Sequence, residues 1–251
     1  MPVSVFSSLP FQPLAVGTTR LAPAEDGEIS ISEAEISILF IGNSLTMSND
    51  MTGMVAALLD SIGAGPTYVW QQAAPGTGLE DHWTVGGLEA IRSGQWDFVV
   101  LQQGPSATEG RPSLWEFAER FAGEIRAVGA MPALYMVWPA ATRSFDFDGV
   151  SESYAEAARL ANGVLLPAGD VWREAWSHEA ALAFYGPDQF HPSQLGSFAA
   201  ALTIAAGLSG EDALGFPHRF RTPSGQVVVI SDAAAAHVKA AVAAVAAGIS
   251  P

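Results

Sequence analysis

The sequence predicts an α/β fold in which a central, mostly parallel five-stranded sheet lies between two layers of helices. Short apolar runs alternate with longer segments whose apolar residues recur at helical spacing. The short runs are mostly continuous in apolar residues, which is typical of parallel strands that are covered on both faces. No internal repeat or linker interrupts this pattern. We therefore expect one domain over residues 35–251, preceded by an irregular arm over residues 1–34 that is rich in Ser, Pro, Ala and Glu.

Each element is expected from its own local pattern. The five strands are the apolar runs at residues 36–41, 67–72, 98–102, 133–138 and 164–166. The helices are expected at residues 51–62, 113–128, 151–161, 171–178, 194–208 and 233–247. Ser113 and Asp170 precede two of these segments and have side chains that commonly cap helix N-termini. Residues 226–230 are expected to add a short edge strand.

The composition excludes several classes of function. The chain has 251 residues, of which 49% are hydrophobic and 15% charged, as in globular proteins. Its net charge of −15 argues against nucleic acid and anionic membranes as partners. The absence of cysteine excludes disulfides, a thiolate nucleophile and cysteine-ligated zinc. The oligomeric state stays open.

The sequence contains neither a membrane-spanning stretch nor a convincing signal peptide. No segment approaches the roughly 20 apolar residues that a transmembrane helix needs. The first residues lack a basic region and are interrupted by Pro10 and Pro13. A cytoplasmic location is therefore slightly favoured.

Polar and glycine-rich residues follow the first three strands. Gly42-Asn43-Ser44 comes after the first, AAPGTGLEDHW after the second and QQGPSATEG after the third. Ligands of parallel α/β sheets bind outside the carboxyl ends of the strands, so these segments are expected to share one rim. Ser44 is a candidate nucleophile, but a serine hydroxyl needs an adjacent base and that base needs an orienting acid.

His191 is the candidate base. It follows Asp188 by three residues in YGPDQFHPSQLGSF, a turn-like segment ahead of a helix. This spacing allows the carboxylate to reach the imidazole and fix its tautomer. An alternative is that Asp188 only caps a turn and that His191 packs near the helix start. His82, in LEDHW, lies on the expected rim, and its role stays open. The remaining three histidines are expected to be structural or at the surface: His178, His218 and His237.

Two motifs carry a resemblance to a known family. Gly42-Asn43-Ser44-Leu45-Thr46 resembles the first block of the SGNH (GDSL-type) hydrolases, whose turn after the first strand carries the nucleophile. Asp188-Gln189-Phe190-His191 is similar to their last block, Asp-x-x-His, and the chain order of the two blocks also fits. The similarity spans about residues 36–208. It implies a flavodoxin-like SGNH fold and a triad of Ser44, His191 and Asp188, with no metal or cofactor. A Gly-x-Ser-x-Gly elbow of the α/β-hydrolase type is missing.

The same resemblance implies where an oxyanion hole would lie. Its donors would be the backbone amides of Ser44 and Gly76, with Gly78 close behind as an alternative, and a side-chain amide after the third strand. The family's third block has an asparagine there, whereas this chain has Gln102-Gln103-Gly104-Pro105-Ser106. Gln103 is the expected donor; Gln102, or a hole built with Ser106, stays an alternative. Asn43 replaces the family's usual aspartate before the nucleophile.

The expected function is hydrolysis of carboxylic esters through an acyl-enzyme. The Gln-Gly pair is similar to that of carbohydrate acetylesterases in the same superfamily, which favours a short acyl group on a glycan or another small ester. A lipase-like or aryl esterase with the same triad is an alternative, as is a non-catalytic glycan-binding module. A metal site built from Asp81, His82, Asp188 and His191 is a further hypothesis. Four aromatic residues near the rim are candidates for a sugar platform or for the core: Trp83, Trp138, Tyr185 and Phe190.

Overall fold

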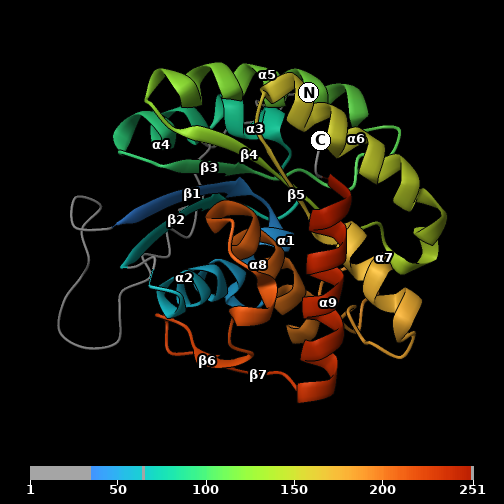
Figure 1. Cartoon of the computed structure of the whole chain (residues 1–251). Coiled ribbons are helices and arrows are strands. Elements are labelled where there is room, and N and C mark those ends of the chain that lie inside the picture. The colour runs from blue at the N-terminus through green and yellow to red at the C-terminus, as the bar shows by residue number, and fades with distance from the viewer. Residues whose placement is uncertain (1–34, 64–65, 250–251) are drawn as a thin grey trace, which may run out of the picture.

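Five parallel strands form the central sheet of the protein. The computed structural model describes residues 35–63 and 66–249, so the expected arm over residues 1–34 lies outside the described residues. The strand order is β2-β1-β3-β4-β5 (Figure 1). Each neighbouring pair in this sheet is parallel. The strands are β1 Ile36–Gly42, β2 Thr67–Ala73, β3 Phe98–Leu101, β4 Met131–Met136 and β5 Val164–Pro167.

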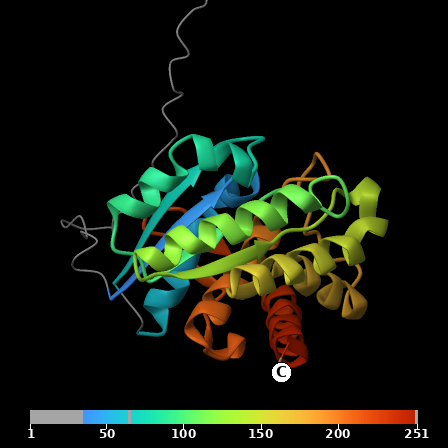
Figure 2. The same cartoon turned by 90° about the horizontal axis from the view of Figure 1, so that it is seen from above.

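Helices cover both faces of the sheet, which confirms the predicted three-layer α/β/α architecture. One layer contains α3 Leu79–Thr84, α4 Gly87–Ser93, α5 Arg111–Ala127 and α6 Phe147–Ala161. Figure 2 shows this layer from above, with the green α5 lying over the sheet and running roughly along its strands. On the other side are α2 Met51–Ser61, α8 Gln194–Ser209 and α9 Asp232–Ile249, with α7 Ala168–His178 packed against α8 and α9. None of the described helices has both the length and the hydrophobicity that a membrane crossing requires.

Most strand residues are apolar because both faces of the sheet are buried, although β2 also contains Thr67, Gln71 and Gln72. In β1, the four successive residues Ile38, Leu39, Phe40 and Ile41 are all fully buried. Burying such a side chain contributes about 1.5–3 kcal/mol relative to leaving it exposed. An amphipathic strand with one solvated face would instead alternate apolar and polar residues. The apolar runs in the sequence therefore correctly predicted a sheet that is covered by helices on both faces.

Some local predictions were wrong. Ser113 does not cap a helix, because α5 already begins at Arg111 with Gly110 at its N-cap. Asp170 lies in the first turn of α7 rather than before it, and its carboxylate accepts a hydrogen bond from Ser151 Oγ at 2.7 Å. The expected edge strand at 226–230 is β7 Val227–Val229, which pairs with β6 Arg219–Arg221 in a separate antiparallel sheet. Six short helical segments of the described residues were not predicted: α1 Ser44–Met47, η1 Ser48–Asp50, α3, α4, η2 Ala141–Asp146 and η3 Ala213–Gly215.

The strand order creates a crevice at the carboxyl end of β1. Because β1 is flanked by β2 on one side and β3 on the other, the connections leave β1 and β3 in opposite directions along the sheet. In flavodoxin-like sheets of this order, the crevice at the carboxyl ends of these two strands is where ligands bind. Ser44 follows β1 and Gln103 follows β3, each after one intervening residue.

Candidate active site

The nucleophile turn, residues 42–46, leads from β1 into α1. Gly42 is required there by close approach, because a Cβ at this position would lie 2.6 Å from Gln102 Oε1 and would also collide with Thr46 Oγ1. Asn43 is the N-cap of α1, and its side-chain oxygen accepts a hydrogen bond from the Leu45 backbone N–H at 3.1 Å. Ser44 is the first residue of the helix.

The Gln102 side chain holds the nucleophile turn in place through hydrogen bonds. Its side-chain oxygen accepts hydrogen bonds from the Asn43 backbone N–H and from Thr46 Oγ1, both at 2.9 Å. Only 1% of the Gln102 residue is exposed. Its side chain is therefore committed to the turn. Of the two adjacent glutamines, Gln103 is the one that lines the cavity beside Ser44.

His82 ties the same turn to the loop after β2. Its Nε2 lies 2.7 Å from the Gly42 carbonyl oxygen and 2.9 Å from Thr77 Oγ1. The Thr77 hydroxyl donates to the Ala74 carbonyl, so the Nε2–H of His82 is the donor to both neighbours. Burial of the imidazole lowers the pKa of His82, which keeps the ring neutral. His82 is therefore a structural link beneath the candidate nucleophile.

Ser44, His191 and Asp188 form one row of hydrogen bonds. Ser44 Oγ lies 2.9 Å from His191 Nε2, and His191 Nδ1 lies 2.5 Å from Asp188 Oδ2. Because a carboxylate can only accept, Nδ1 carries the proton and Nε2 is left with the lone pair that faces the serine. The hydrogen bond from the imidazole, with those from the backbone N–H groups of Phe190 and His191, lowers the pKa of Asp188 to about 2. The carboxylate is therefore ionised at neutral pH.

In the acid–base loop, residues 188–192, the side chains of the acid and the base are partly exposed, whereas the backbone is fixed by hydrogen bonds. About half of the Asp188 side chain and 40% of the His191 side chain are accessible. The second carboxylate oxygen of Asp188 accepts hydrogen bonds from the backbone N–H groups of Phe190 and His191, at 3.1 and 2.9 Å. Trp138, which is fully buried and stacked on Trp172, donates its indole N–H to the Phe190 carbonyl at 3.0 Å.

Asn49, which follows the nucleophile turn, connects this part of the chain to the acid–base loop. This role was not recognisable from the sequence. Its side-chain nitrogen donates to the Pro192 carbonyl and to Ser197 Oγ, both at 2.9 Å. The residue adopts a left-handed backbone conformation, with φ of 54°. Asparagine tolerates this conformation better than most residues do, but nothing in the linear pattern indicated its distant partners.

A cavity of about 390 Å³ lies in front of Ser44. Its walls come from the loops after β1, β2 and β3 and from the acid–base loop: Asn43, Ser44, Gly76, Thr77, Gly78, Gln103, Gly104, Pro105, Ser106, Gly110 and Phe190. Within the described residues, the backbone N–H groups of Ser44 and Gly76 donate to no other group. Gly76 adopts a φ of +75°, which favours glycine. The N–H of Gly78 is bound instead to Asp81 Oδ2 at 2.8 Å.

Gln103 lines this cavity with its side-chain amide engaged. Its nitrogen donates to Ser106 Oγ and to the Gly110 carbonyl, both at 3.0 Å, and its oxygen accepts from the Leu79 N–H at 3.1 Å. The buried Tyr154 hydroxyl holds the backbone of Gln103 through both its N–H and its carbonyl group. A hydrogen bond from Gln103 to an oxyanion would therefore replace or share one of these two donor bonds.

Other candidate residues lie elsewhere. Among the residues that the structure describes, no three His, Asp or Glu side chains are grouped to hold a metal ion, so the four-residue metal hypothesis has no geometric support. Of the aromatic candidates, Phe190 lines the cavity. Trp138 is buried, Trp83 packs against Phe117 and Phe121, and Tyr185 donates to the Pro139 carbonyl at 2.6 Å.

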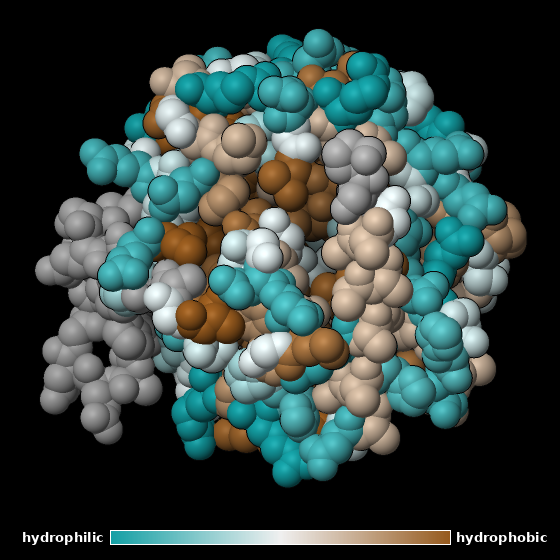
Figure 3. All heavy atoms as spheres, in the orientation of Figure 1, coloured by the Kyte–Doolittle hydropathy of each residue, from teal (hydrophilic) through white to brown (hydrophobic). Residues whose placement is uncertain are grey.

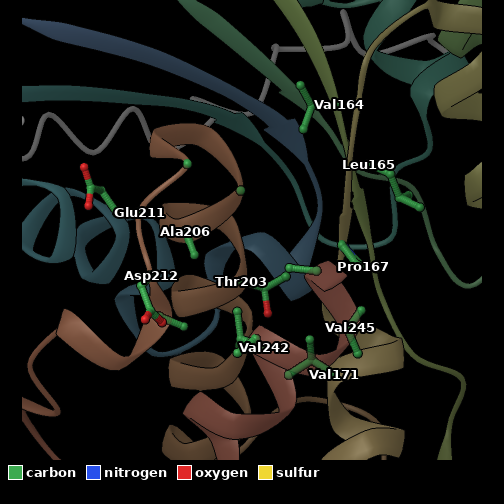
Figure 4. Close-up of a pocket in the computed structure, with 15 residues that line it drawn as sticks. Val164, Leu165, Pro167, Val171, Thr203, Ala206, Glu211, Asp212, Val242 and Val245 are labelled. Atoms are coloured by element: carbon green, nitrogen blue, oxygen red, sulfur yellow. The ribbon is translucent and has the colours of Figure 1, made fainter. Parts of the chain in front are cut away.

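A second hollow has no candidate residue in it. It measures about 570 Å³ and lies between β5, α7, α8 and α9. Figure 4 shows its mostly aliphatic lining, which includes Val164, Val171 and Val242. Brown side chains gather in a hollow beside the pale, alanine-rich α9 in the space-filling view (Figure 3). Its lining holds two carboxylates, Glu211 and Asp212, and the Thr203 hydroxyl, which donates to the Ala199 carbonyl, but it holds no histidine that could serve as a base. The Ser44 cavity therefore remains the candidate site.

Solved structures share this fold. A candidate SGNH hydrolase from Slackia heliotrinireducens is 27% identical to this chain, over 69% of this chain and 98% of its own, with a TM-score of 0.60. This chain belongs to the SGNH hydrolase superfamily. A DUF4886 family protein from Bacteroides uniformis aligns over 84% of this chain and 95% of its own, with 16% identity and a TM-score of 0.67.

A further SGNH-fold neighbour is an acetyl xylan esterase from Geobacillus stearothermophilus. It is 14% identical, covers 72% of this chain and 97% of its own, and has a TM-score of 0.56. No protein-family model matches the sequence, and no curated protein matches it. The SGNH resemblance was therefore visible in short motifs and in three-dimensional structure, whereas the sequence as a whole has diverged.

Proposed function

We propose that this SGNH-superfamily chain is a serine esterase that hydrolyses carboxylic esters through an acyl-enzyme, with a short acyl group such as acetyl on a carbohydrate as its substrate. The observation that carries the proposal is the row from Asp188 through His191 to Ser44, with spacings of 2.5 and 2.9 Å, at the wall of an open cavity. A nucleophile, its base and the orienting acid are the three parts that acyl transfer requires.

In the proposed reaction, Ser44 Oγ attacks the ester carbonyl while His191 Nε2 takes its proton. Asp188 stabilises the imidazolium that forms. The backbone N–H groups of Ser44 and Gly76, together with the Gln103 amide, donate to the oxyanion. Collapse of the intermediate breaks the bond to the alcohol, which receives the proton from His191. Water then attacks the acyl-serine with His191 again as base, releasing the acid and restoring Ser44.

The proposed substrate class rests on the size and lining of the cavity. A volume of about 390 Å³ accommodates an acetyl group with part of a sugar ring, and Phe190 supplies an aromatic wall. A neighbour of the same fold is an acetyl xylan esterase, which supports this choice by analogy. A lipase-like or aryl esterase is the second candidate, because the triad itself does not select the acyl chain.

The proposal is tested by the hydrolysis of p-nitrophenyl acetate, butyrate and octanoate, alongside acetylated xylose. We expect the acetate to have the highest kcat/KM and the acetylated sugar to release acetate. Ser44→Ala should reduce turnover by about 10⁴-fold or more. A preference for octanoate would favour the lipase-like alternative. If no ester is hydrolysed, the non-catalytic glycan-binding alternative replaces the proposal.

A further inference from the structure

A smaller cavity adjoins the one in front of Ser44. It measures about 260 Å³ and lies between the loops that follow β3 and β4. The two cavities share Pro105, Ser106, Gly110 and Phe190 as walls. Its remaining lining includes Pro139, Arg143 and Asp146. The shared walls make the smaller cavity a natural extension of the space in which an ester would react.

The topology places this smaller cavity on the leaving-group side of Ser44. Gly76, a proposed oxyanion donor, follows β2, whereas the smaller cavity lies on the opposite side of β1, beyond β3. The acid–base loop is docked on the β4 side through hydrogen bonds from Trp138 Nε1 to the Phe190 carbonyl and from Ala141 N–H to the Gln189 carbonyl. The alcohol oxygen must lie near His191 to receive its proton, so the alcohol portion extends toward this side.

The polar groups of the smaller cavity can bind hydroxyl groups. Arg143 Nε donates to Asp146 Oδ2 at 2.5 Å, while its terminal nitrogen lies 3.7 Å from Glu109 Oε2. Within the described residues, Glu109 is the only partner of the terminal guanidinium nitrogens, and its side chain is 77% exposed, while Asp146 Oδ1 accepts no hydrogen bond. Donors and an acceptor are thus available side by side, and only 14% of the Asp146 side chain is exposed.

We propose that the smaller cavity binds the alcohol portion of the ester as a neutral sugar ring. Arg143 and Asp146 hydrogen-bond its hydroxyl groups, and the Phe190 ring packs against its apolar face. The carboxylates of Glu109, Asp146 and Asp188 outnumber the single guanidinium around this part of the site, so an anionic sugar is disfavoured. This inference rests on the proposed esterase function and names the group from which the acyl chain is removed.

The test compares two acetate esters in wild-type protein and in Arg143→Gln. One ester is a singly acetylated methyl xyloside, and the other is p-nitrophenyl acetate, whose ring is of similar size but has no hydroxyl groups. The control is Arg159→Gln, which removes another arginine paired with an acidic residue three positions away, on the surface of α6. The measured quantity is the ratio of kcat/KM for the sugar ester to kcat/KM for p-nitrophenyl acetate.

We expect Arg143→Gln to lower this ratio by about ten-fold or more, the size of effect that follows loss of a hydrogen bond to a charged group. Asp146→Asn should lower it in the same direction, and Arg159→Gln should leave it unchanged. An unchanged ratio in Arg143→Gln, or an equal fall in Arg159→Gln, would overturn the inference. If wild-type protein hydrolyses p-nitrophenyl acetate but not the sugar ester, the inference fails while the esterase proposal stands. If it hydrolyses neither, the proposed function itself fails.

Discussion

The nucleophile turn and the acid–base loop contribute to the same hydrogen-bonded row but are built in opposite ways. The turn is held by buried side chains: Gln102 and His82 are 1% and 3% exposed, and both bond to its backbone. The loop presents Asp188 and His191 with about half and 40% of their side chains accessible to solvent. Its support comes mainly from its own backbone, which hydrogen-bonds Asp188 and Trp138.

This difference in burial predicts that the two regions contribute differently to stability and to activity. Buried polar groups are costly to leave unpaired, so a change beneath the turn should lower the free energy of unfolding as well as activity. Exposed side chains contribute little to stability, so a change in the loop should affect activity almost alone. The stability and the kinetics of matched variants can therefore distinguish the two roles.

The largest effect on activity is expected in the acid–base loop. His191→Ala should lower kcat/KM by about 10⁴-fold or more, because Ser44 loses its base. Asp188→Asn should cost about 10- to 100-fold less, since the base remains but its tautomer is no longer fixed. Urea unfolding should show both variants within about 0.5 kcal/mol of wild type. A loss of several kcal/mol in either would contradict the proposed division between the two regions.

The pH profile of kcat/KM sharpens the same prediction. Asp188 has a pKa of about 2 and stays ionised throughout the range above about pH 4. The acid limb of the profile should therefore show a single ionisation, that of the base, with activity rising as the pH rises because only the neutral imidazole accepts the serine proton. An acid limb with two ionisations would show that Asp188 also titrates, and a flat profile would exclude a histidine base.

Gln102 and Gln103, which follow β3, allow the stabilising role and the catalytic role to be compared at two adjacent residues. Gln102→Ala leaves two buried donors, the Asn43 N–H and Thr46 Oγ1, without a partner and should cost about 1–3 kcal/mol for each. Gln103→Ala should lower kcat about 10- to 100-fold with little change in KM, because a bond to the oxyanion forms only as charge develops. Urea unfolding and steady-state kinetics on p-nitrophenyl acetate provide the two readouts.

Gln103→Glu should be worse than Gln103→Ala, since a carboxylate repels the forming oxyanion. If Gln102→Ala instead lowers kcat selectively and Gln103→Ala is silent, the two roles are exchanged. If neither variant alters kcat, the oxyanion hole consists of the Ser44 and Gly76 amides, or is completed by Ser106.

The smallest effect is expected at His82, and it concerns stability. Burial lowers its pKa, so as the pH falls below about 6.5 the unfolded chain binds a proton that the folded chain refuses. Acidification therefore lowers the free energy of unfolding of the wild-type protein. His82→Phe has no imidazole at this position, so its free energy of unfolding lacks this pH dependence. The variant should be less stable than wild type by about 1–3 kcal/mol at pH 8, and the gap should narrow at pH 5. A gap that widens would mean that the folded imidazole is protonated.

The sequence predicted the fold wherever burial left a simple pattern. The continuous apolar run of β1 indicated a strand covered on both faces, and Ser44 stood at its carboxyl end. Asp188 and His191 were recognisable because their spacing is local. The short helices α3 and α4 were missed because six or seven residues between glycines give too little periodicity. The edge strand expected at residues 226–230 does not join the central sheet, because it pairs with β6, which the sequence did not predict, in a sheet of its own.

The supports of the site were not predictable from the sequence in the same way. Gln102 was considered as an oxyanion donor, yet its side chain braces the nucleophile turn, because adjacent strand residues point to opposite sides. His82 was ambiguous because its partners, Gly42 and Thr77, are set by tertiary packing. Asn49 contacts Pro192 across most of the chain, and no local pattern encodes that contact.

The central claim, that Ser44 is a nucleophile activated by His191, is tested most directly by labelling with a serine-reactive p-nitrophenyl phosphonate and peptide mass spectrometry. We expect one covalent adduct, on the peptide containing Ser44, in wild-type protein. Ser44→Ala should give none, and His191→Ala should react far more slowly. An adduct on another serine that persists in Ser44→Ala, or no adduct in wild-type protein that hydrolyses esters, would contradict the claim.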